Sequence, residues 1–294
     1  MKRAAGAAPP GAAPGRTAGL ILCGGRSSRM GVDKALLRIG PRTLLDLALE
    51  HMGQVAAPVV LSITARQDPP RGYERLEWVR DEQADQGPLF GMARGFRALT
   101  GRAERVVVMP VDMPFLTGPW LARLVAGLAG HQACLFRWQG FTNALTAAYA
   151  LALLPRLEAL IQEGRRRPIA LIEGVPTRVL EIEGDAERQS GPPSMMDTDT
   201  PADYREALRL AGFGSAGGVP VWVSLPTEGG LVQLPLFAAT AGEALDYIGA
   251  VYPEHGAADG HPAPRLWRGS GGARAPLRPA DSLVAEERLD CALS

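Results

Sequence analysis

The chain is organised around residues 20–34, which read Leu20-Ile21-Leu22-Cys23-Gly24-Gly25-Arg26-Ser27-Ser28-Arg29-Met30-Gly31-Val32-Asp33-Lys34. The stretch begins as an apolar run, typical of a buried strand, and a pair of glycines then breaks the run. Two arginines, two serines and a lysine follow the glycines. Because glycines let backbone N–H groups approach a ligand closely and converging cations favour an anion, the stretch predicts a triphosphate-binding loop.

Two common phosphate-loop patterns are absent from this stretch. Gly31 is followed by Val32 rather than by Lys-Ser or Lys-Thr, and the glycines do not follow a Gly-x-Gly-x-x-Gly spacing. A plain turn would explain the glycine pair alone. It would not explain Arg26, Arg29 and Lys34 in one strand-to-helix connection, because the mutual repulsion of three cations favours a bound polyanion.

The composition is that of a globular protein without a strong net electrostatic field. The 294 residues include 31 basic and 31 acidic side chains, giving a formal net charge of zero, and 46% are hydrophobic. Zero net charge argues against a general nucleic-acid or membrane binder, because both rely on a positive field. Three widely spaced cysteines, Cys23, Cys134 and Cys291, predict neither a disulfide nor a zinc site. Without a signal-like or membrane-spanning apolar stretch, a cytoplasmic protein is expected.

The order of apolar runs and amphipathic segments predicts an α/β fold. Continuous apolar runs, typical of parallel strands, alternate with segments of helical periodicity through short connections. Strands are expected at residues 19–23, 58–63, 76–79, 105–110, 133–138, 144–149 and 178–182, and helices from Thr43 and at about 87–99, 116–128, 151–163 and 165–173. We therefore expect a doubly wound, mostly parallel sheet.

Composition shifts divide the chain into four parts. Residues 1–17, rich in Ala, Gly and Pro, are expected to form a disordered leader. Residues 18–211 hold the α/β domain, and the Gly- and Ser-containing residues 212–218 form a flexible linker. Residues 219–294 show a hairpin pattern, a helical stretch and weaker extended pieces, which predict a small α+β domain of the β-grasp kind.

Several aspartates follow predicted strands. Asp112 stands after a buried strand, on the edge where open α/β sheets bind ligands, so beside a phosphate loop it is a candidate magnesium ligand. Asp197 and Asp199 alternate in an extended segment and are expected to point to the same side. Asp199 is either a helix cap before Thr200-Pro201 or a second carboxylate for the metal. Asp81 is a further candidate for contact with the base or sugar of a nucleotide.

Three motifs together resemble those of the molybdenum cofactor guanylyltransferases. They are Leu22-Cys23-Gly24-Gly25-x-Ser27-x-Arg29-Met30-Gly31-x-Asp33-Lys34, Gly87-Pro88-Leu89-x-Gly91-Met92 and Pro110-x-Asp112-Met113-Pro114. The resemblance covers about residues 17–211. It implies a Rossmann-like nucleotidyltransferase that uses GTP and Mg²⁺ to attach GMP to molybdopterin cofactor, with release of pyrophosphate.

The resemblance also implies roles for single residues. Those expected to contact the nucleotide are Leu22, Cys23, Gly24, Lys34, Ser62, Asp81 and Asp112. Of these, Asp81 matches a nucleotide-binding aspartate after the third strand, and Asp112 matches the magnesium-binding one. Ser62 stands where the family usually has an asparagine that binds guanosine.

Departures from the family pattern leave the nucleotide open between GTP and CTP. Asp197-Thr198-Asp199-Thr200-Pro201 replaces the usual Asn-x-Asn-Thr-Pro and is more similar to cytidylyltransferases and sugar-type relatives. Ser62 lacks the amide of the usual asparagine, and Phe141-Thr142-Asn143 replaces a frequent His-Pro pair before the strand that faces the cofactor. Gly24-Gly25 favours GTP, because cytidylyl relatives tend to have Ala-Gly. The alternative reactions are CMP transfer to the same cofactor and nucleotidyl transfer to another phosphorylated acceptor.

In the implied reaction, a terminal phosphate of the acceptor attacks the α-phosphorus in line, so the protein mainly supplies positioning and charge. Arg29 and Lys34 are expected to bind the phosphates. The backbone N–H groups of Gly24-Gly25 are expected to cradle them. Asp112, together with Asp199, is expected to hold Mg²⁺.

The C-terminal part has a fainter resemblance, to the ubiquitin-like sulfur carrier of molybdopterin synthase. It is carried by Ala239-Thr240-Ala241-Gly242-Glu243-Ala244-Leu245-Asp246 and Leu277-Arg278-Pro279-Ala280-Asp281-Ser282-Leu283. That carrier works through a terminal Gly-Gly, whereas the sequence here reads Asp290-Cys291-Ala292-Leu293-Ser294. A docking role toward molybdoenzymes or cofactor-delivery proteins is therefore expected. A third hypothesis is a cofactor-binding chaperone without turnover.

Overall fold

The computed structural model describes residues 16–24, 34–40, 42–70, 72–82, 87–182, 194–212, 219–227, 230–238, 264–268, 275–277 and 287–293, together with Ala241, Gly242, Ala244, Leu245 and Ile248. The chain divides into two compact units. The first unit comprises residues 1–25, 48–111 and 116–191, and the second comprises residues 26–47, 112–115 and 192–294. The four-part division expected from composition stays a prediction.

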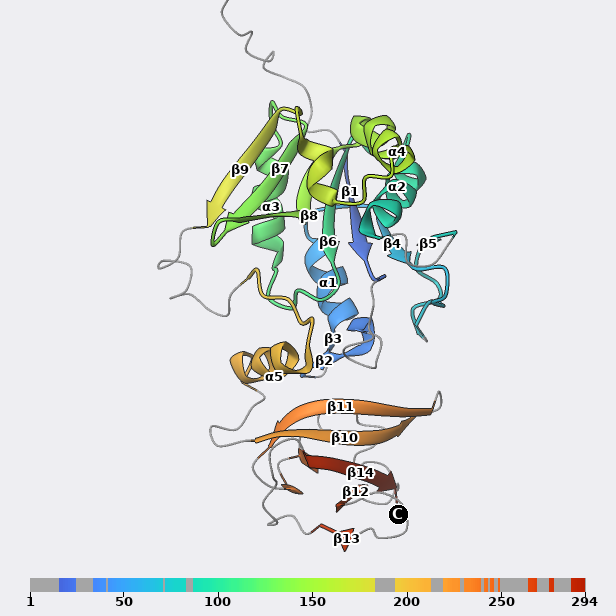
Figure 1. Ribbon diagram of the computed structural model, residues 1–294, viewed down its shortest axis with the longest axis vertical. Coiled ribbons are helices and arrows are strands. Elements are labelled where there is room, and N and C mark those ends of the chain that lie inside the picture. Colours follow the sequence, from blue (N-terminus) through green and yellow to red (C-terminus); the bar gives the residue numbers. More distant parts are fainter. Residues whose placement is uncertain are drawn as a thin grey trace, which may run out of the picture. The chain divides into compact units, whose positions relative to one another are not determined.

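A seven-stranded sheet forms the centre of the first unit (Figure 1). In spatial order its strands are β5 (Trp78–Arg80), β4 (Val59–Ile63), β1 (Thr17–Leu22), β6 (Arg105–Pro110), β8 (Phe141–Ala150), β7 (Ala133–Trp138) and β9 (Thr177–Ile182). The first four are parallel to one another, β8 runs antiparallel to β6 and β7, and β9 is parallel to β7. The sheet is thus mostly parallel, as predicted.

One edge of this sheet collects the ends of its parallel strands. We call it the carboxyl edge; β1, β4, β5 and β6 end there. Leu22 pairs with both Ser62 and Pro110, so the neighbouring strands end at nearly the same level as β1. Since β8 is antiparallel to β6, the turn between β7 and β8 lies at the same edge. Open α/β sheets bind ligands at this edge.

Helices cover both faces of the sheet because successive strand residues point to opposite sides. The helices are α1 (Leu44–Gly53), α2 (Pro88–Leu99), α3 (Gly118–Gly127) and α4 (Leu154–Gln162), with 3₁₀ turns at Leu151–Leu153 and Pro168–Ile172. Leu20 and Leu22 share a buried cluster with residues of α2 and α4. Gly19, which precedes Leu20 in β1, points to the opposite face of the sheet, toward Met52 of α1. The fold is doubly wound, as expected.

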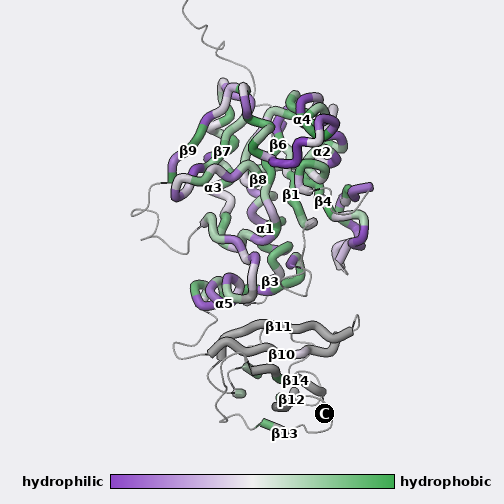
Figure 2. The backbone as a smooth tube through the Cα atoms, viewed as in Figure 1, coloured by the Kyte–Doolittle hydropathy of each residue, from purple (hydrophilic) through white to green (hydrophobic). Residues whose placement is uncertain are grey.

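The interior between these layers is apolar and tightly packed. Figure 2 shows hydrophobic residues along the central strands and hydrophilic ones on the outer turns of the helices. Phe96 of α2 is fully buried and packs against the ring of Tyr149 of β8, with 6.1 Å between ring centroids. A Cβ built on Gly95 would lie 2.5 Å from the Leu20 side chain, so this glycine lets α2 lie close to β1.

The described helical segment after residue 165 differs from the prediction. A regular helix is expected over residues 165–173, but the structure has a 3₁₀ turn over Pro168–Ile172. Arg167 is extended, with φ −84° and ψ 122°. The reason is Pro168, because a proline disfavours helical geometry in the residue before it. None of the helices in the described part of the chain has the length and apolar character of a membrane span.

Three sequence segments build the described part of the second unit before residue 213. They contain a 3₁₀ turn at Lys34–Leu36, the short strands β2 (Arg38–Ile39) and β3 (Arg42–Thr43), and α5 (Pro201–Leu210). Thr43, where this helix is predicted to begin, caps α1: its Oγ1 accepts from the N–H of Asp46 at 3.0 Å, and Asp46 Oδ2 accepts from the N–H of Thr43 at 2.9 Å. This reciprocal pair is a capping box.

The C-terminal part of the second unit contains a five-stranded mixed sheet. In spatial order its strands are β11 (Gly230–Ala238), β10 (Val219–Thr227), β14 (Glu287–Leu293), β12 (Pro264–Arg268) and β13 (Ala275–Pro276). β10 and β11 form the predicted hairpin, and β10 also pairs in parallel with β14. Ala244 and Ile248, which belong to the stretch predicted to be helical, are helical and buried. One of the weaker extended pieces predicted in this part, around residues 282–285, lies outside the described residues.

Candidate functional site

The carboxyl end of β1 is positioned by backbone contacts with the neighbouring strand. The N–H of Cys23 donates to the carbonyl oxygen of Ser62 at 2.8 Å. A Cβ built on Gly24 would lie 3.0 Å from Thr64 Cγ2 and 3.2 Å from the Thr64 backbone nitrogen. Leu22 and Cys23 are buried, whereas Gly24 is exposed. The main chain is therefore exposed at Gly24, and a side chain there would press against the chain after β4.

Ser62 of β4 is buried beneath α2. Its side chain occupies the space that a side chain on Gly91 would need, since a Cβ there would lie 2.7 Å from Ser62 Oγ. Ser62 itself is only 3% exposed. The two small residues interlock, and the predicted contact of Ser62 with a nucleotide stays a prediction.

Asp81 directly follows β5 at the same edge. Its N–H donates to the carbonyl oxygen of Ile63 at 3.1 Å, which fixes its backbone beside β4. Its Oδ1 is buried, and no hydrogen-bond partner for it occurs among the described residues. Burial raises the pKa of the Asp81 carboxyl, and the positive charge of Arg94 opposes this shift. Arg94 itself pairs with Glu82. Asp81 Oδ1 is thus a buried acceptor that forms no hydrogen bond with the described residues.

The turn between β7 and β8 places an aromatic ring at the carboxyl edge. Gln139 and Gly140 have positive φ values of 49° and 81°, as two-residue hairpin turns require. Phe141, the next residue, is 81% exposed. Arg137 pairs with Glu181 of β9 at 2.8 Å and anchors the hairpin close to its turn. The sequence shows that Phe141-Thr142-Asn143 departs from a family pattern, but the exposure of Phe141 is seen only in the structure.

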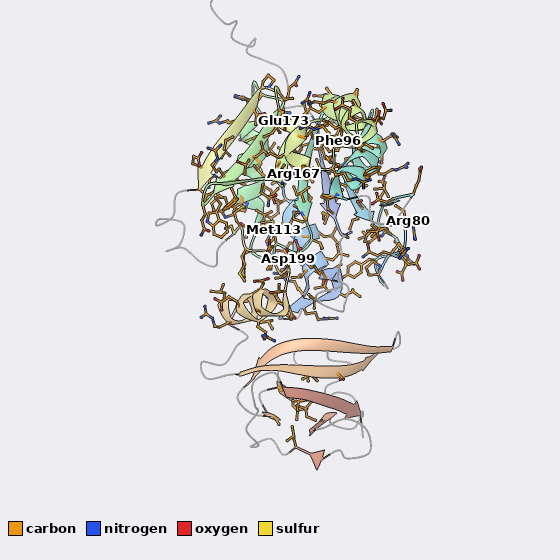
Figure 3. The ribbon with its side chains drawn as sticks, in the orientation of Figure 1. Arg80, Phe96, Met113, Arg167, Glu173 and Asp199 are labelled. Carbon is orange, nitrogen blue, oxygen red and sulfur yellow. The ribbon has the colours of Figure 1, made fainter. Side chains whose placement is uncertain are left out.

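A cluster of one lysine and two aspartates lies within the second unit. Lys34 Nζ donates to Asp112 Oδ2 at 2.7 Å and to Asp199 Oδ1 at 2.5 Å. The side chains of Lys34 and Asp112 are each 15% exposed, whereas that of Asp199 is 51% exposed. Figure 3 labels Asp199 on the segment that leads into α5. We call these three residues the Lys34 cluster; it joins three segments that are far apart in the sequence.

Thr198 holds two of these segments together. Its N–H donates to the carbonyl oxygen of Asp112 at 2.9 Å, and its Oγ1 donates to the same oxygen at 3.2 Å. Thr198 is fully buried. Farther along, the Tyr204 hydroxyl of α5 donates to the carbonyl oxygen of Arg38 at 2.6 Å. Thr198 is not among the functional residues predicted from the sequence. The signal that could have indicated it is its position between Asp197 and Asp199, because alternation in an extended segment puts its side chain on the opposite face.

The structure separates the two roles that the sequence allows for Asp199. Thr200 is the N-cap of α5: its Oγ1 accepts from the N–H of Asp203 at 3.2 Å, and Asp203 Oδ2 accepts from the N–H of Thr200 at 2.8 Å. Pro201 stands in the first turn, where a missing N–H matters little. The cap therefore uses Thr200 and Asp203, and Asp199 bonds to Lys34.

The electrostatics of the cluster favour a charged lysine. Burial alone would lower the pKa of Lys34, but attraction and hydrogen bonds from Asp112 and Asp199 outweigh it and raise the pKa above its usual value. Partial burial raises the pKa of Asp197, and the negative charges of its acidic neighbours add to this, while Lys34 opposes it. The cluster thus holds one ammonium within a strongly negative group.

The donor set also fits a divalent cation. Asp112 and Asp199 already share one cation, the Lys34 ammonium, and carboxylate oxygens are what Mg²⁺ prefers. Across the described residues, no group of three or more His, Cys, Asp and Glu side chains is placed to hold a metal. Two carboxylates suit an ion that keeps waters and takes further ligands from a substrate. Gly25 and Arg29, predicted to contact phosphates, lie outside the described residues.

The fold defines a class of proteins. Its doubly wound sheet is shared with solved nucleotidyltransferases. One is the 2-C-methyl-D-erythritol 4-phosphate cytidylyltransferase of Thermus thermophilus, with TM-score 0.51, 21% identity and coverage of 67% of this chain and 99% of that chain. Another is the molybdopterin-guanine dinucleotide biosynthesis protein A of Archaeoglobus fulgidus, with TM-score 0.54, 22% identity and coverage of 66% and 98%.

Comparison with known sequences identifies a narrower group of proteins than comparison of folds. The chain belongs to the MobA-like NTP transferase domain family, which matches residues 19–176, more than half of its length. It is 34% identical over 173 residues to a probable molybdenum cofactor guanylyltransferase of Mycobacterium ulcerans; the match covers 58% of this chain and 85% of that relative. The predicted membership and the Rossmann-like nucleotidyltransferase fold are therefore confirmed. The relation of the C-terminal part to a ubiquitin-like carrier stays a prediction.

Proposed function

We propose that the protein transfers GMP from GTP to molybdopterin cofactor and releases pyrophosphate. Family membership supports the reaction class, nucleotidyl transfer. The name of the relative from Mycobacterium ulcerans, a probable molybdenum cofactor guanylyltransferase, supports both the acceptor and the nucleotide. The match covers most of that relative, so the similarity is not confined to a short motif.

The observation that carries the choice of GTP is the unused oxygen of Asp81. Buried polar atoms are nearly always hydrogen-bonded, yet Asp81 Oδ1 has no partner among the described residues. Guanine has two adjacent donors, N1–H and its 2-amino group, that match the two oxygens of a carboxylate. Cytosine has an acceptor at the corresponding ring nitrogen, so it offers no such pair. We therefore assign Asp81 to the guanine base.

In the proposed reaction, an acceptor phosphate oxygen forms a bond to the α-phosphorus of GTP. The bond from that phosphorus to the bridging oxygen of the β-phosphate breaks, and pyrophosphate leaves with the electron pair. No protein nucleophile is needed, because the attacking phosphate is already anionic at neutral pH. Catalysis then depends on alignment and on neutralising the triphosphate charge.

The chain's own residues divide this work. Exposed main chain at Gly24 approaches the phosphates, and Lys34, with Arg29 from the loop, neutralises their charge. Asp112 and Asp199 would hold Mg²⁺, which when bound neutralises phosphate charge and helps the leaving group depart. Asp112 is the better buried of the two carboxylates and so the more strictly positioned.

The acceptor ring is assigned to the β7–β8 hairpin. Phe141 is a large, exposed aromatic residue on a turn held at the carboxyl edge. Aromatic rings stack on planar heterocycles such as a pterin. This assignment rests on the exposure of Phe141 and on the edge where it lies.

The second candidate is CMP transfer to the same acceptor, or transfer to another phosphorylated acceptor. It is motivated by Asp197-Thr198-Asp199-Thr200-Pro201 and by Ser62, both departures from the guanylyl pattern. A cofactor-binding chaperone without turnover is the third.

One assay separates these candidates. The protein is incubated with molybdopterin cofactor, Mg²⁺ and one of GTP, CTP, ATP or UTP, and pyrophosphate release is measured. We expect release with GTP at least about tenfold faster than with CTP, corresponding to about 1.4 kcal/mol of discrimination. Faster release with CTP would overturn the guanylyl assignment. Binding of GTP and cofactor without any pyrophosphate would favour the chaperone.

A further inference from the structure

Lys34 occupies the position that the proposed function gives to the metal. Its ammonium bonds at 2.7 Å to Asp112 and at 2.5 Å to Asp199, the same two carboxylates proposed to hold Mg²⁺. One lysine therefore cannot keep both bonds while a divalent cation takes the same oxygens. Lys34 and the metal would therefore compete for the same pair of carboxylates.

The residue type is notable in this sequence. Lys2 and Lys34 are the only lysines among the 31 lysine and arginine residues. A guanidinium is a wide, planar group, whereas an ammonium is a compact point charge close in character to a small cation. A lysine can therefore sit between two carboxylates without spreading them.

Thr198 keeps these carboxylates together. Its two hydrogen bonds to the Asp112 carbonyl oxygen fix the Asp199 segment against Asp112, and Thr198 is fully buried. The two aspartates thus share one cation rather than holding two separate ones, because they cannot move apart without breaking this contact. Removing the ammonium alone would leave two carboxylates unneutralised, one of them largely buried, which is unfavourable.

We propose that Lys34 is an internal counter-ion that couples metal binding to nucleotide binding. Without nucleotide, Lys34 holds Asp112 and Asp199 and excludes the divalent cation. The triphosphate gives the ammonium a new partner and adds oxygen ligands, so the carboxylates exchange Lys34 for the metal. This inference rests on the proposed function, and it adds that metal and nucleotide bind together rather than separately.

The protein ligand count supports the coupling. Among the described residues, no third His, Cys, Asp or Glu joins the two carboxylates in a metal-binding group. Mg²⁺ usually completes its shell with substrate phosphates and waters. A displaced ammonium needs those same phosphates. By linkage, the metal then raises nucleotide affinity by the factor by which nucleotide raises metal affinity.

The test measures Mn²⁺ and Mg²⁺ affinity of the full chain by calorimetry without nucleotide. Lys34→Met should bind the metal at least about tenfold more tightly than the unmodified protein, because it removes both the competing cation and its repulsion. Arg209→Met is the matched control: it removes one positive charge from α5, where Arg209 pairs with Glu206, and should leave metal affinity unchanged. Equal tightening in both variants would overturn the proposal, as would no tightening in Lys34→Met.

A second measurement adds a GTP analogue that cannot transfer GMP. It should raise the metal affinity of the unmodified protein at least about tenfold, and raise that of Lys34→Met by less. Lys34→Gln keeps a polar side chain and serves as a second variant in case Lys34→Met does not fold. Its melting temperature should rise more on adding Mn²⁺ than that of the unmodified protein. Absence of both effects would overturn the proposal while pyrophosphate release from GTP still stood, so the two proposals fail separately.

Discussion

The carboxyl edge of the first unit and the Lys34 cluster of the second unit are built on opposite principles. At the edge, Gly24, Ser62 and Gly91 are small and neutral, and close backbone packing decides what fits. In the cluster, one ammonium and two carboxylates hold each other through charge. The difference teaches that the edge can discriminate by shape and hydrogen bonding, as proposed for the base at Asp81, whereas the cluster can discriminate by charge, as proposed for the metal.

The largest effect should come from the charged region. Asp112→Asn removes the better buried carboxylate of the Lys34 cluster, so neither Lys34 nor a metal is fully neutralised. We expect kcat for GMP transfer to fall at least ~100-fold, the size typical of losing a preorganised electrostatic contact. Glu173→Gln is the control, because Glu173 is a half-exposed acid paired with Arg165. A variant of Asp112 with near-normal kcat would remove this residue from the site.

The next effect should come from Asp81 and appear in nucleotide choice. Asp81→Asn replaces one acceptor by a donor, so KM for GTP should rise roughly 10-fold to 100-fold while KM for CTP changes little. Because the pKa of Asp81 is raised, GTP affinity should also be lost as pH falls through that pKa, and this pH dependence should be absent from Asp81→Asn. Glu82→Gln, at the neighbouring exposed acid, is the control. Equal losses with both nucleotides would contradict base recognition.

A smaller effect is expected at the hairpin. Phe141→Ala should raise KM for the cofactor roughly threefold to tenfold, as expected for losing one stacking contact, with KM for GTP unchanged. Phe141→Trp keeps a stacking surface and should stay close to the unmodified protein. If Phe141→Ala alters KM for GTP instead, the ring belongs to the nucleotide side.

The smallest effect is on stability. The folded protein raises the pKa of Asp197, so its charged form is disfavoured at neutral pH. Asp197→Asn should raise Tm by about 1–2 °C at pH 7, a small shift because the group is partly exposed. The gain should shrink as pH falls through the raised pKa and vanish below pH 3.8, where both states are protonated. A gain that persists in acid would point to another cause.

The two regions also differ in how far the sequence predicts them. The strands, the helix that begins at Pro88 and the Thr43 cap follow from neighbours along the chain, so local patterns predict them. The Lys34 cluster joins residues up to 165 positions apart, and no local pattern shows which charges meet. Lys34 is predicted on the phosphates, whereas in the structure it bonds to the two aspartates. The exposure of Phe141 likewise depends on how β7 and β8 pair.

Because the sequence contains only two lysines, chemical labelling of Lys34 can report on the state of the Lys34 cluster. Amine-directed reagents meet only two lysine side chains in this sequence, Lys2 and Lys34. An ammonium that is 15% exposed and bonded to two carboxylates is protected from such a reagent. Peptide mass spectrometry of partly labelled protein would then follow the state of Lys34 in a crude mixture, without a purified cofactor.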